Sequence, residues 1–324
     1  MQKPFPFLTY LSLSSYAEIA PVLHEEVFGG SAPCLQRLIL QNIAFPGFLR
    51  LASFASHLSY IVLWDIPING YISPEAMATC LATLPSLVIL AIGFQSPLSR
   101  PDRINLYPPT RAVLPALIQF YFKGVSEYLE DLVARIDTPK LFRLDIRLFM
   151  DLMFHTPRLN NFIARAERIR PDISANVTFS ATHIQISIGS VGLEISCREP
   201  DWQVSSMAQL CRQLSPLTSH MESLEISENT PRQARQGNGI DPTQWFELFD
   251  LFPAVQNLYI HDELRPLVAR ALQELTRERA TEVLPTLRGL FFKGPSPPGS
   301  IREDIQTFIT ARQHSDHPVD VHWD

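Results

Sequence analysis

The feature that most constrains the fold of this chain is a short apolar pattern that recurs along most of its length. Nine segments place apolar residues in the order apolar-x-x-apolar-x-apolar. They begin at Leu8, Leu35, Leu58, Leu87, Leu117, Leu141, Met221, Val255 and Leu287. Successive starts are 27, 23, 29, 30, 24, 80, 34 and 32 residues apart. Self-similarity at a nearly fixed period predicts a repeat protein, in which stacked units bury one continuous core.

The 80-residue gap between the sixth and seventh segments contains three further strand-like pieces. They cover residues 177–179, 184–188 and 193–195. Glycines at positions 189 and 192 separate the last two pieces and supply residues suited to a tight turn. We therefore expect an irregular insertion over 147–220 that holds one degenerate repeat and a hairpin.

The segments between the strands carry helical signals, with apolar residues at spacings of three and four. Met77, Cys80, Leu81 and Leu84 form one such stripe after Ser73-Pro74, where serine can cap a helix and proline suits its first position. Asp241-Pro242-Thr243-Gln244 precedes another stripe and reads as a capping box. The alternation of strand and helix predicts parallel strands joined by crossover helices.

The polar residues of the strands decide between two parallel architectures. A doubly wound sheet or a barrel buries both faces of its strands, which then read as continuous apolar runs. Here the strands alternate, and one face carries residues such as Arg37, Lys123 and Arg143. We therefore predict an α/β fold of the leucine-rich-repeat type. This is an open horseshoe solenoid with a parallel sheet on the concave side and helices on the convex side.

We expect the solenoid to span residues 1–312 as one domain. Two polar, proline- or glycine-containing loops interrupt it at 96–110 and 228–240, and residues 313–324 are expected to form a tail.

Composition excludes several classes of function. A net charge of −6 argues against nucleic-acid binding, which depends on neutralising phosphates. The proline-broken start is no signal peptide, and no apolar run approaches the ~18 residues of a membrane helix. Four scattered cysteines without a Cys-x-x-Cys pair indicate free thiols, so we expect a cytoplasmic or nuclear protein without membrane contact.

The sequence carries none of the motifs that mark common active sites. Glycine-rich phosphate loops, His-Glu-x-x-His and Gly-x-Ser-x-Gly are all absent. The tail histidines at 314, 317 and 322 are more simply solvated side chains than a zinc site, which needs four well-placed ligands. We therefore expect no enzymatic activity, no cofactor and no metal.

Seven stretches resemble a known family. They are residues 70–82, 93–104, 124–140, 195–212, 243–248, 281–288 and 308–320. In them the chain resembles the leucine-rich-repeat-like C-terminal regions of basidiomycete fungal F-box proteins. The resemblance implies a substrate receptor of an SCF-type, cullin-RING ubiquitin ligase.

The F-box itself is missing from this sequence. That module docks on the Skp1 adaptor and usually opens with Leu-Pro-x-Glu, which does not occur here. A truncated gene model and a true loss of the module both explain this. We therefore expect Skp1 as a partner only if an F-box exists upstream.

The predicted binding surface follows from the alternation of side chains along each strand. The third, fifth and seventh positions of each repeat point away from the core. Tyrosine, tryptophan and arginine among them are residue types enriched at interface hot spots. The predicted protein-binding residues are Tyr60, Trp64, Tyr121, Lys123, Arg143, Asp145, Arg147, Glu225 and Tyr259. The alternative is that long N-terminal loops cover the apolar members of this face, such as Val62 and Ile89, and make them ordinary core.

Two functional hypotheses remain. The first is a target-binding repeat protein of F-box descent, whose protein target is unknown. The second is a scaffold or regulatory interaction protein that uses the same surface without any link to ubiquitin.

Overall fold

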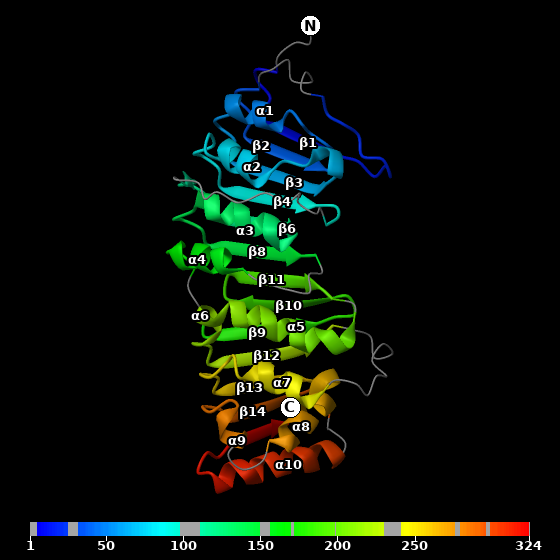
Figure 1. Cartoon of the computed structure of the whole chain (residues 1–324), viewed down its shortest axis with the longest axis vertical. Coiled ribbons are helices and arrows are strands. Elements are labelled where there is room, and N and C mark those ends of the chain that lie inside the picture. The colour runs from blue at the N-terminus through cyan, green and yellow to red at the C-terminus, as the bar shows by residue number, and fades with distance from the viewer. Residues whose placement is uncertain are drawn as a thin grey trace. The chain divides into compact units, whose positions relative to one another are not determined.

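A computed structural model describes residues 5–24, 32–97, 111–149, 156–169, 172–197, 199–229, 241–275, 279–295 and 299–323. The chain divides into two compact units, residues 1–169 and 170–324, where the sequence analysis expected one domain over 1–312. Each unit is a mixed α/β structure with a largely parallel sheet (Figure 1). Most of the expected loops, at 98–110 and 230–240, lie outside the described residues.

Unit 1 contains a sheet of six strands in chain order, all parallel. The strands are β1 (Tyr10–Ser14), β2 (Arg37–Gln41), β3 (Tyr60–Ile66), β4 (Ile89–Phe94), β6 (Gln119–Gly124) and β8 (Arg143–Leu148). A separate parallel pair joins β5 (Ala112–Val113) to β7 (Ile136–Asp137). The six strands of the larger sheet coincide with the first six apolar segments of the sequence.

The repeat pattern sets the register of this sheet. Leu38, Ile61, Leu90, Phe120 and Leu144 occupy the same repeat position and stand beside one another on successive strands. Each of these five side chains is fully buried. Removing apolar surface from water at every repeat therefore fixes both which strands pair and which face turns inward.

The helices of unit 1 pack on one side of its sheet (Figure 1). They are α1 (Phe48–Phe54), α2 (Pro74–Leu81), α3 (Ser126–Arg135) and α4 (Pro157–Arg165), with a 3₁₀ turn η2 (Ile68–Gly70). The predicted cap of α2 is confirmed, because Ser73 Oγ accepts the amide of Ala76 at 3.3 Å. Met77, Cys80 and Leu81 are buried, as the helical stripe predicts.

Unit 2 contains the irregular insertion and the last three repeats. Its strands lie in the order β11 (Val191–Ser196), β10 (His183–Ile188), β9 (Ser174–Phe179), β12 (Ser223–Glu228), β13 (Asn257–His261), β14 (Gly289–Lys293) and β15 (Asp320–Trp323). The predicted hairpin is confirmed: β10 and β11 pair antiparallel through a turn at Gly189, whose φ of 54° favours glycine. β9 pairs antiparallel with β10 and parallel with β12.

The helices of unit 2 also lie along one side of its sheet (Figure 1). They are α5 (Pro200–Gln213), α6 (Ser215–Thr218), α7 (Pro242–Phe249), α8 (Arg265–Glu274), α9 (Arg279–Glu282) and α10 (Gly299–His314), with a 3₁₀ turn η3 (Asp262–Leu264). Asp241 caps α7, since its Oδ1 accepts the amide of Thr243 at 3.0 Å. The reciprocal half of the expected capping box does not form, because Gln244 Oε1 is buried without a hydrogen-bond partner.

The end of the chain is more ordered than the expected tail at 313–324. Helix α10 continues to His314, and β15 pairs in parallel with β14. Arg312 of α10 contacts the segments that precede β14 and β15: its side chain is fully buried, Nη2 donates to Leu287 O at 2.9 Å, and Nε donates to His317 O at 3.1 Å. The polar composition of the last residues concealed this strand.

Two predictions at the level of the whole chain remain predictions. They are the continuity of one open solenoid across both units and its horseshoe curvature. Within the residues that the structure describes, no helix has the length and apolar character needed to cross a membrane.

Candidate functional site

The nine predicted binding residues fall on the open sheet faces of the two units. Seven lie on β3, β6 and β8 of unit 1, and two lie on β12 and β13 of unit 2. All nine are at least partly accessible, and Arg143 and Arg147 are the most exposed. Their inward neighbours along each strand are buried, so the alternation predicted from the sequence is confirmed. Their role in binding stays a prediction.

A β-bulge organises the first cluster on unit 1. The pairing of β3 with β4 shifts between Leu63 and Ile66, so that Trp64 and Asp65 together stand opposite Gly93. Asp65 adopts a left-handed conformation with φ 52°. A Cβ atom on Gly93 would lie 2.7 Å from Trp64 Cε3, so the indole packs directly against the glycine backbone.

Lys123 completes this cluster, which we call the Trp64 cluster (Gln41, Trp64, Asp65, Lys123 and Phe149). The Lys123 ammonium lies 2.9 Å from Asp65 Oδ1 and 5.8 Å from the centre of the Trp64 ring. It is also 6.0 Å from the centre of the Phe149 ring, and Gln41 Nε2 donates to Asp65 Oδ2 at 3.4 Å. An ion pair and two cation–π contacts therefore hold the lysine in place.

Sequence reasoning identified Trp64 and Lys123 but missed Asp65. The alternation of an unbroken strand directs residue 65 toward the core, and the bulge turns it to the open face instead. An aspartate in an otherwise apolar strand was the available signal, because aspartate is among the residues that tolerate positive φ.

A second row of contacts lies at the beginning of the same strands. Arg143 Nε donates to Asp145 Oδ2 at 2.7 Å, and its guanidinium lies 5.8 Å from the Tyr121 ring centre. The hydrogen bond and the charge of Asp145 raise the pKa of Arg143 above its usual value. Arg37 lies 6.0 Å from the ring centre of Tyr60. These rings and cations are thus held by one another before any partner arrives.

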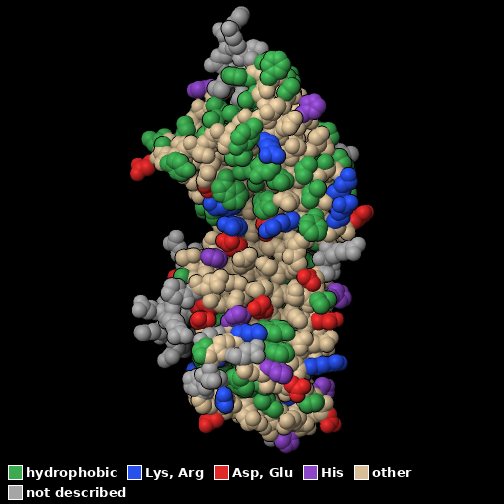
Figure 2. All heavy atoms as spheres, turned by 180° about the vertical axis from the view of Figure 1, so that it is seen from behind, with side chains coloured by type: hydrophobic (Ala, Val, Ile, Leu, Met, Phe, Trp, Pro, Cys, Tyr) green, Lys and Arg blue, Asp and Glu red, His purple; other side chains and the backbone are tan. Residues whose placement is uncertain are grey.

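Apolar side chains lie beside these contacts. Ile39 and Val62 stand side by side on β2 and β3, Ile89 on β4 stands opposite Tyr60, and all three are half-buried. Figure 2 shows hydrophobic side chains gathered on this face of unit 1, with lysine and arginine side chains around them. The sequence alternative, in which long N-terminal loops cover Val62 and Ile89, stays untested, because residues 1–4 and 25–31 lie outside the described part of the chain.

The open face of unit 2 carries a row of side chains that is more polar than the rows on unit 1. Register places Ser187, Asn176, Glu225 and Tyr259 side by side on β10, β9, β12 and β13. Glu225 is held from both sides: His261 Nε2 lies 2.6 Å from Oε1, and Asn176 Nδ2 donates to Oε2 at 3.4 Å. The sequence pattern predicts Glu225 as a binding residue but does not reveal these two supporting neighbours.

An aromatic stack continues this row toward the end of the chain. Tyr259 stacks on Phe291 and Phe291 stacks on His322, with ring centres 4.6 Å apart in both pairs. The Lys293 ammonium lies 5.8 Å from the Tyr259 ring centre. The stack fixes the orientation of the Tyr259 ring.

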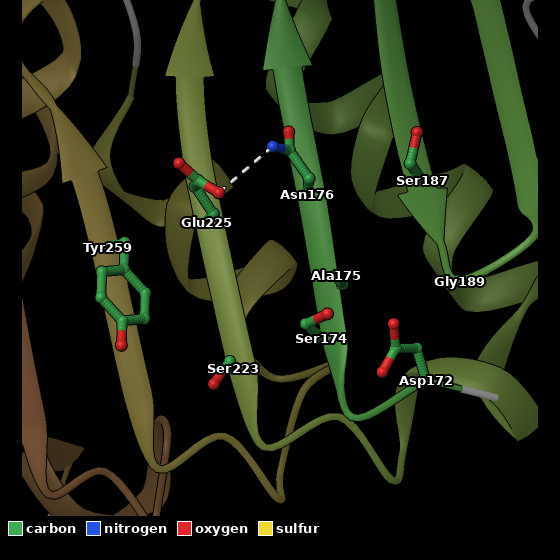
Figure 3. Close-up of a pocket in the computed structure, with 9 residues that line it drawn as sticks. All are labelled: Asp172, Ser174, Ala175, Asn176, Ser187, Gly189, Ser223, Glu225 and Tyr259. Carbon is green, nitrogen blue, oxygen red and sulfur yellow. Dashed lines mark hydrogen bonds between the residues drawn. The ribbon is translucent and has the colours of Figure 1, made fainter.

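A hollow of about 280 Å³ lies beside Glu225 and Tyr259 (Figure 3). We call it the serine pocket; it is lined by Asp172, Ser174, Ala175, Asn176, Ser187, Gly189, Ser223, Glu225 and Tyr259. Serine, alanine and glycine make up much of the lining, and their small size leaves the space open. The pocket was not predicted from the sequence, because its lining comes from four separate segments.

The chain has a weak likeness to a leucine-rich-repeat protein of known structure. The crystal structure of the leucine-rich repeat-containing protein LegL7 from Legionella pneumophila matches over 93% of this chain and 90% of that chain. The two sequences are 13% identical, and the TM-score is 0.34. A likeness this weak does not establish a fold or a function. No protein-family model matches the chain, and no curated protein matches it.

The groups that could do other chemistry are placed as follows. Cys80, Cys197 and Cys211 are buried and Cys34 is exposed, and all four are free thiols. Burial raises the pKa of Cys80 to about 12. Among the residues whose positions are described, no group of three or more His, Cys, Asp or Glu side chains is placed to hold a metal ion.

Proposed function

We propose that this chain is a non-catalytic, protein-binding repeat domain of the leucine-rich-repeat type, and that the open face of unit 1 carries its main binding surface. The observation that carries the proposal is the Trp64 cluster together with the row of Tyr121 and Arg143. Half-exposed aromatic rings and cations are fixed there by mutual contacts. Side chains that are already ordered lose little conformational entropy on binding, so such a surface is suited to recognition.

The surface has the composition of an interface. A half-buried apolar centre of Ile39, Val62 and Ile89 is bordered by aromatic and charged side chains. Protein interfaces combine an apolar centre enriched in aromatic residues and arginine with a polar rim. A sheet face that shows this arrangement on consecutive parallel strands offers an extended surface to a partner.

The absence of enzymatic activity is part of the proposal. Nucleophilic cysteines in enzymes have a lowered pKa and partial exposure. Cys80 has the opposite combination, because it is buried in the helix layer with a raised pKa. Its role is packing.

The family resemblance adds a cellular role to the proposal. We propose that the bound protein is a substrate of an SCF-type ubiquitin ligase, with this chain as the target-recognition region of an F-box receptor. The second candidate is a scaffold without any link to ubiquitin, and the same surface supports it equally. The two differ in whether the partner's ubiquitination depends on this chain.

The experiment replaces Trp64, Tyr121 and Arg147 by alanine in the full chain. A partner is first identified by proximity labelling, and its affinity for the purified variants is then measured by calorimetry. We expect a loss of about 2 kcal/mol or more of binding free energy for each true hot spot. Trp64 and Tyr121 are half-buried and Arg147 is exposed, so their loss should cost less stability than the loss of a fully buried side chain, and the variant should melt later than Leu90→Ala.

Two controls make the result interpretable. Arg50→Ala with Phe54→Ala removes an exposed arginine and an exposed aromatic ring from α1, on the helical side, and should leave affinity unchanged. Leu90→Ala removes a fully buried side chain and should destabilise the protein by about 2–5 kcal/mol. Normal binding by the triple variant, or melting as early as that of Leu90→Ala, contradicts the assignment of this face.

A further inference from the structure

The serine pocket of unit 2 exists because several outward side chains are small. Ser174 and Ser223 stand side by side on β9 and β12, at the same level as Asn257 on β13. At the corresponding positions of unit 1, Arg37, Tyr60 and Arg143 fill the surface. The small side chains at these positions therefore leave a hollow in the open face of unit 2.

Hydrogen-bond acceptors dominate the lining of this hollow. It contains the carboxylates of Asp172 and Glu225, the hydroxyls of Ser174, Ser187 and Ser223, the Asn176 amide and the Tyr259 ring (Figure 3). None of the nine lining residues is a lysine, arginine or histidine. A group that fills the pocket therefore meets two negative charges and several acceptors, with no lining cation to balance them.

The position of Glu225 is set before any ligand enters. His261 and Asn176 hold its two oxygens from opposite neighbouring strands. Tyr259 is likewise held by its stack on Phe291. A carboxylate and an aromatic ring fixed in this way lose little freedom when they bind a cation.

The charge of the surrounding unit has the same sign. Residues 170–324 carry 13 lysines and arginines against 20 aspartates and glutamates, whereas residues 1–169 carry 14 against 13. The formal net charge is therefore −7 in unit 2 and +1 in unit 1, so the field of unit 2 attracts cations.

From these observations we infer that the serine pocket binds the guanidinium group of an arginine side chain on the partner protein. A guanidinium presents five N–H donors in a plane and pairs well with carboxylates, whereas a lysine ammonium has three donors. The volume of about 280 Å³ lies just below the roughly 300–1,000 Å³ of pockets for drug-sized ligands, so it suits a single side chain. That a partner protein supplies this side chain rests on the proposed function; the binding of a guanidinium does not.

The test uses the full chain and three short peptides of the form acetyl-Gly-Gly-X-Gly-Gly-amide. X is arginine, lysine or citrulline, which is neutral and nearly isosteric with arginine. Binding is followed by nuclear magnetic resonance through the backbone amides of Ser174, Asn176 and Ser223. We expect the arginine peptide to bind with a dissociation constant on the order of 1 mM, the lysine peptide more weakly, and the citrulline peptide not at all.

Variants identify the residues responsible. Glu225→Gln combined with Asp172→Asn should weaken the arginine peptide at least tenfold, and Ser223→Tyr should abolish binding by filling the hollow. The matched controls Glu194→Gln and Ser196→Tyr change the same residue types on β11, outside the pocket, and should bind normally. Unchanged melting temperatures confirm that each variant is folded.

The inference would be overturned if the arginine peptide did not bind at concentrations up to 10-fold above the expected dissociation constant. It would also be overturned if the citrulline peptide bound as tightly as the arginine peptide, or if the pocket variants bound the arginine peptide normally. These outcomes are independent of the proposed function, because the peptides need no natural partner. Conversely, a failure of the Trp64, Tyr121 and Arg147 variant to lose partner binding leaves the peptide result intact.

Discussion

One backbone torsion, at Asp65, decides where two charged side chains lie on the face of unit 1. The left-handed conformation of this residue creates the bulge and brings its carboxylate within 2.9 Å of Lys123. Left-handed backbone costs an L-residue about 1–2 kcal/mol, and aspartate and asparagine tolerate it better than β-branched residues. A strained residue at a surface that we propose to bind protein is consistent with the general association of strain with functional sites.

The bulge leads to a prediction with two substitutions. Asp65→Asn keeps a residue suited to positive φ and loses a partly exposed ion pair, so it should cost at most about 1 kcal/mol of unfolding free energy. Asp65→Val adds the torsional penalty and should cost about 1–2 kcal/mol more. Chemical denaturation measures both differences.

Asp145→Val is the matched control, since Asp145 also forms an ion pair on the same face but lies in a regular strand. Equal losses for Asp65→Val and Asp145→Val would show that the bulge stores no torsional cost.

At the scale of elements, one helix of unit 1 provides the cap of the next. The N-cap residue of α4, Thr156, makes no side-chain cap. Instead the buried Glu130 of α3 accepts the amides of Arg158 at 2.9 Å and Leu159 at 2.8 Å. A carboxylate at a helix N-terminus satisfies amides that have no partner within the helix and is favoured by the helix dipole.

The contact predicts a large effect from a single carboxylate. Glu130→Ala leaves two amides at the start of α4 without their acceptor, so it should destabilise unit 1 by about 1–3 kcal/mol. Glu127→Ala removes an exposed carboxylate from the same helix and should change stability by no more than about 0.5 kcal/mol. Denaturation midpoints compare the two, and similar losses would contradict the capping role of Glu130.

At the scale of the whole molecule, the family resemblance and the motifs present in the sequence lead to different expectations for the binding of Skp1. The resemblance implies an F-box receptor, whereas these 324 residues contain no Leu-Pro-x-Glu segment to open an F-box. The nine apolar repeat segments of these residues form strands of the two units.

We therefore expect the purified chain of residues 1–324 to bind no Skp1. Size-exclusion chromatography of a mixture with recombinant Skp1 should show two separate peaks, with an intact F-box protein as the positive control. A stoichiometric complex would mean that a docking module exists in a form that the sequence motif does not reveal.

The sequence by itself determined nine of the strands, the register of the repeats and their buried face. Every one of the nine apolar segments coincides with a strand, and repeat positions such as Leu38, Ile61 and Leu90 align in the sheet. The helix cap at Ser73 and the hairpin turn at Gly189 were also predicted from the sequence. These features follow from local chemistry: apolar periodicity, capping side chains and glycine at a turn act within a few residues of one another.

Only the tertiary structure decided the features that join distant segments. The bulge at Asp65 depends on the fit of Trp64 against Gly93, and the cap of α4 comes from a residue 28 positions away. The helix before β15 is held by Arg312, which donates to Leu287 O, 25 residues away, and the serine pocket combines four segments. Each is an energetic compromise among side chains that meet only after the chain has folded, so no local pattern encodes it.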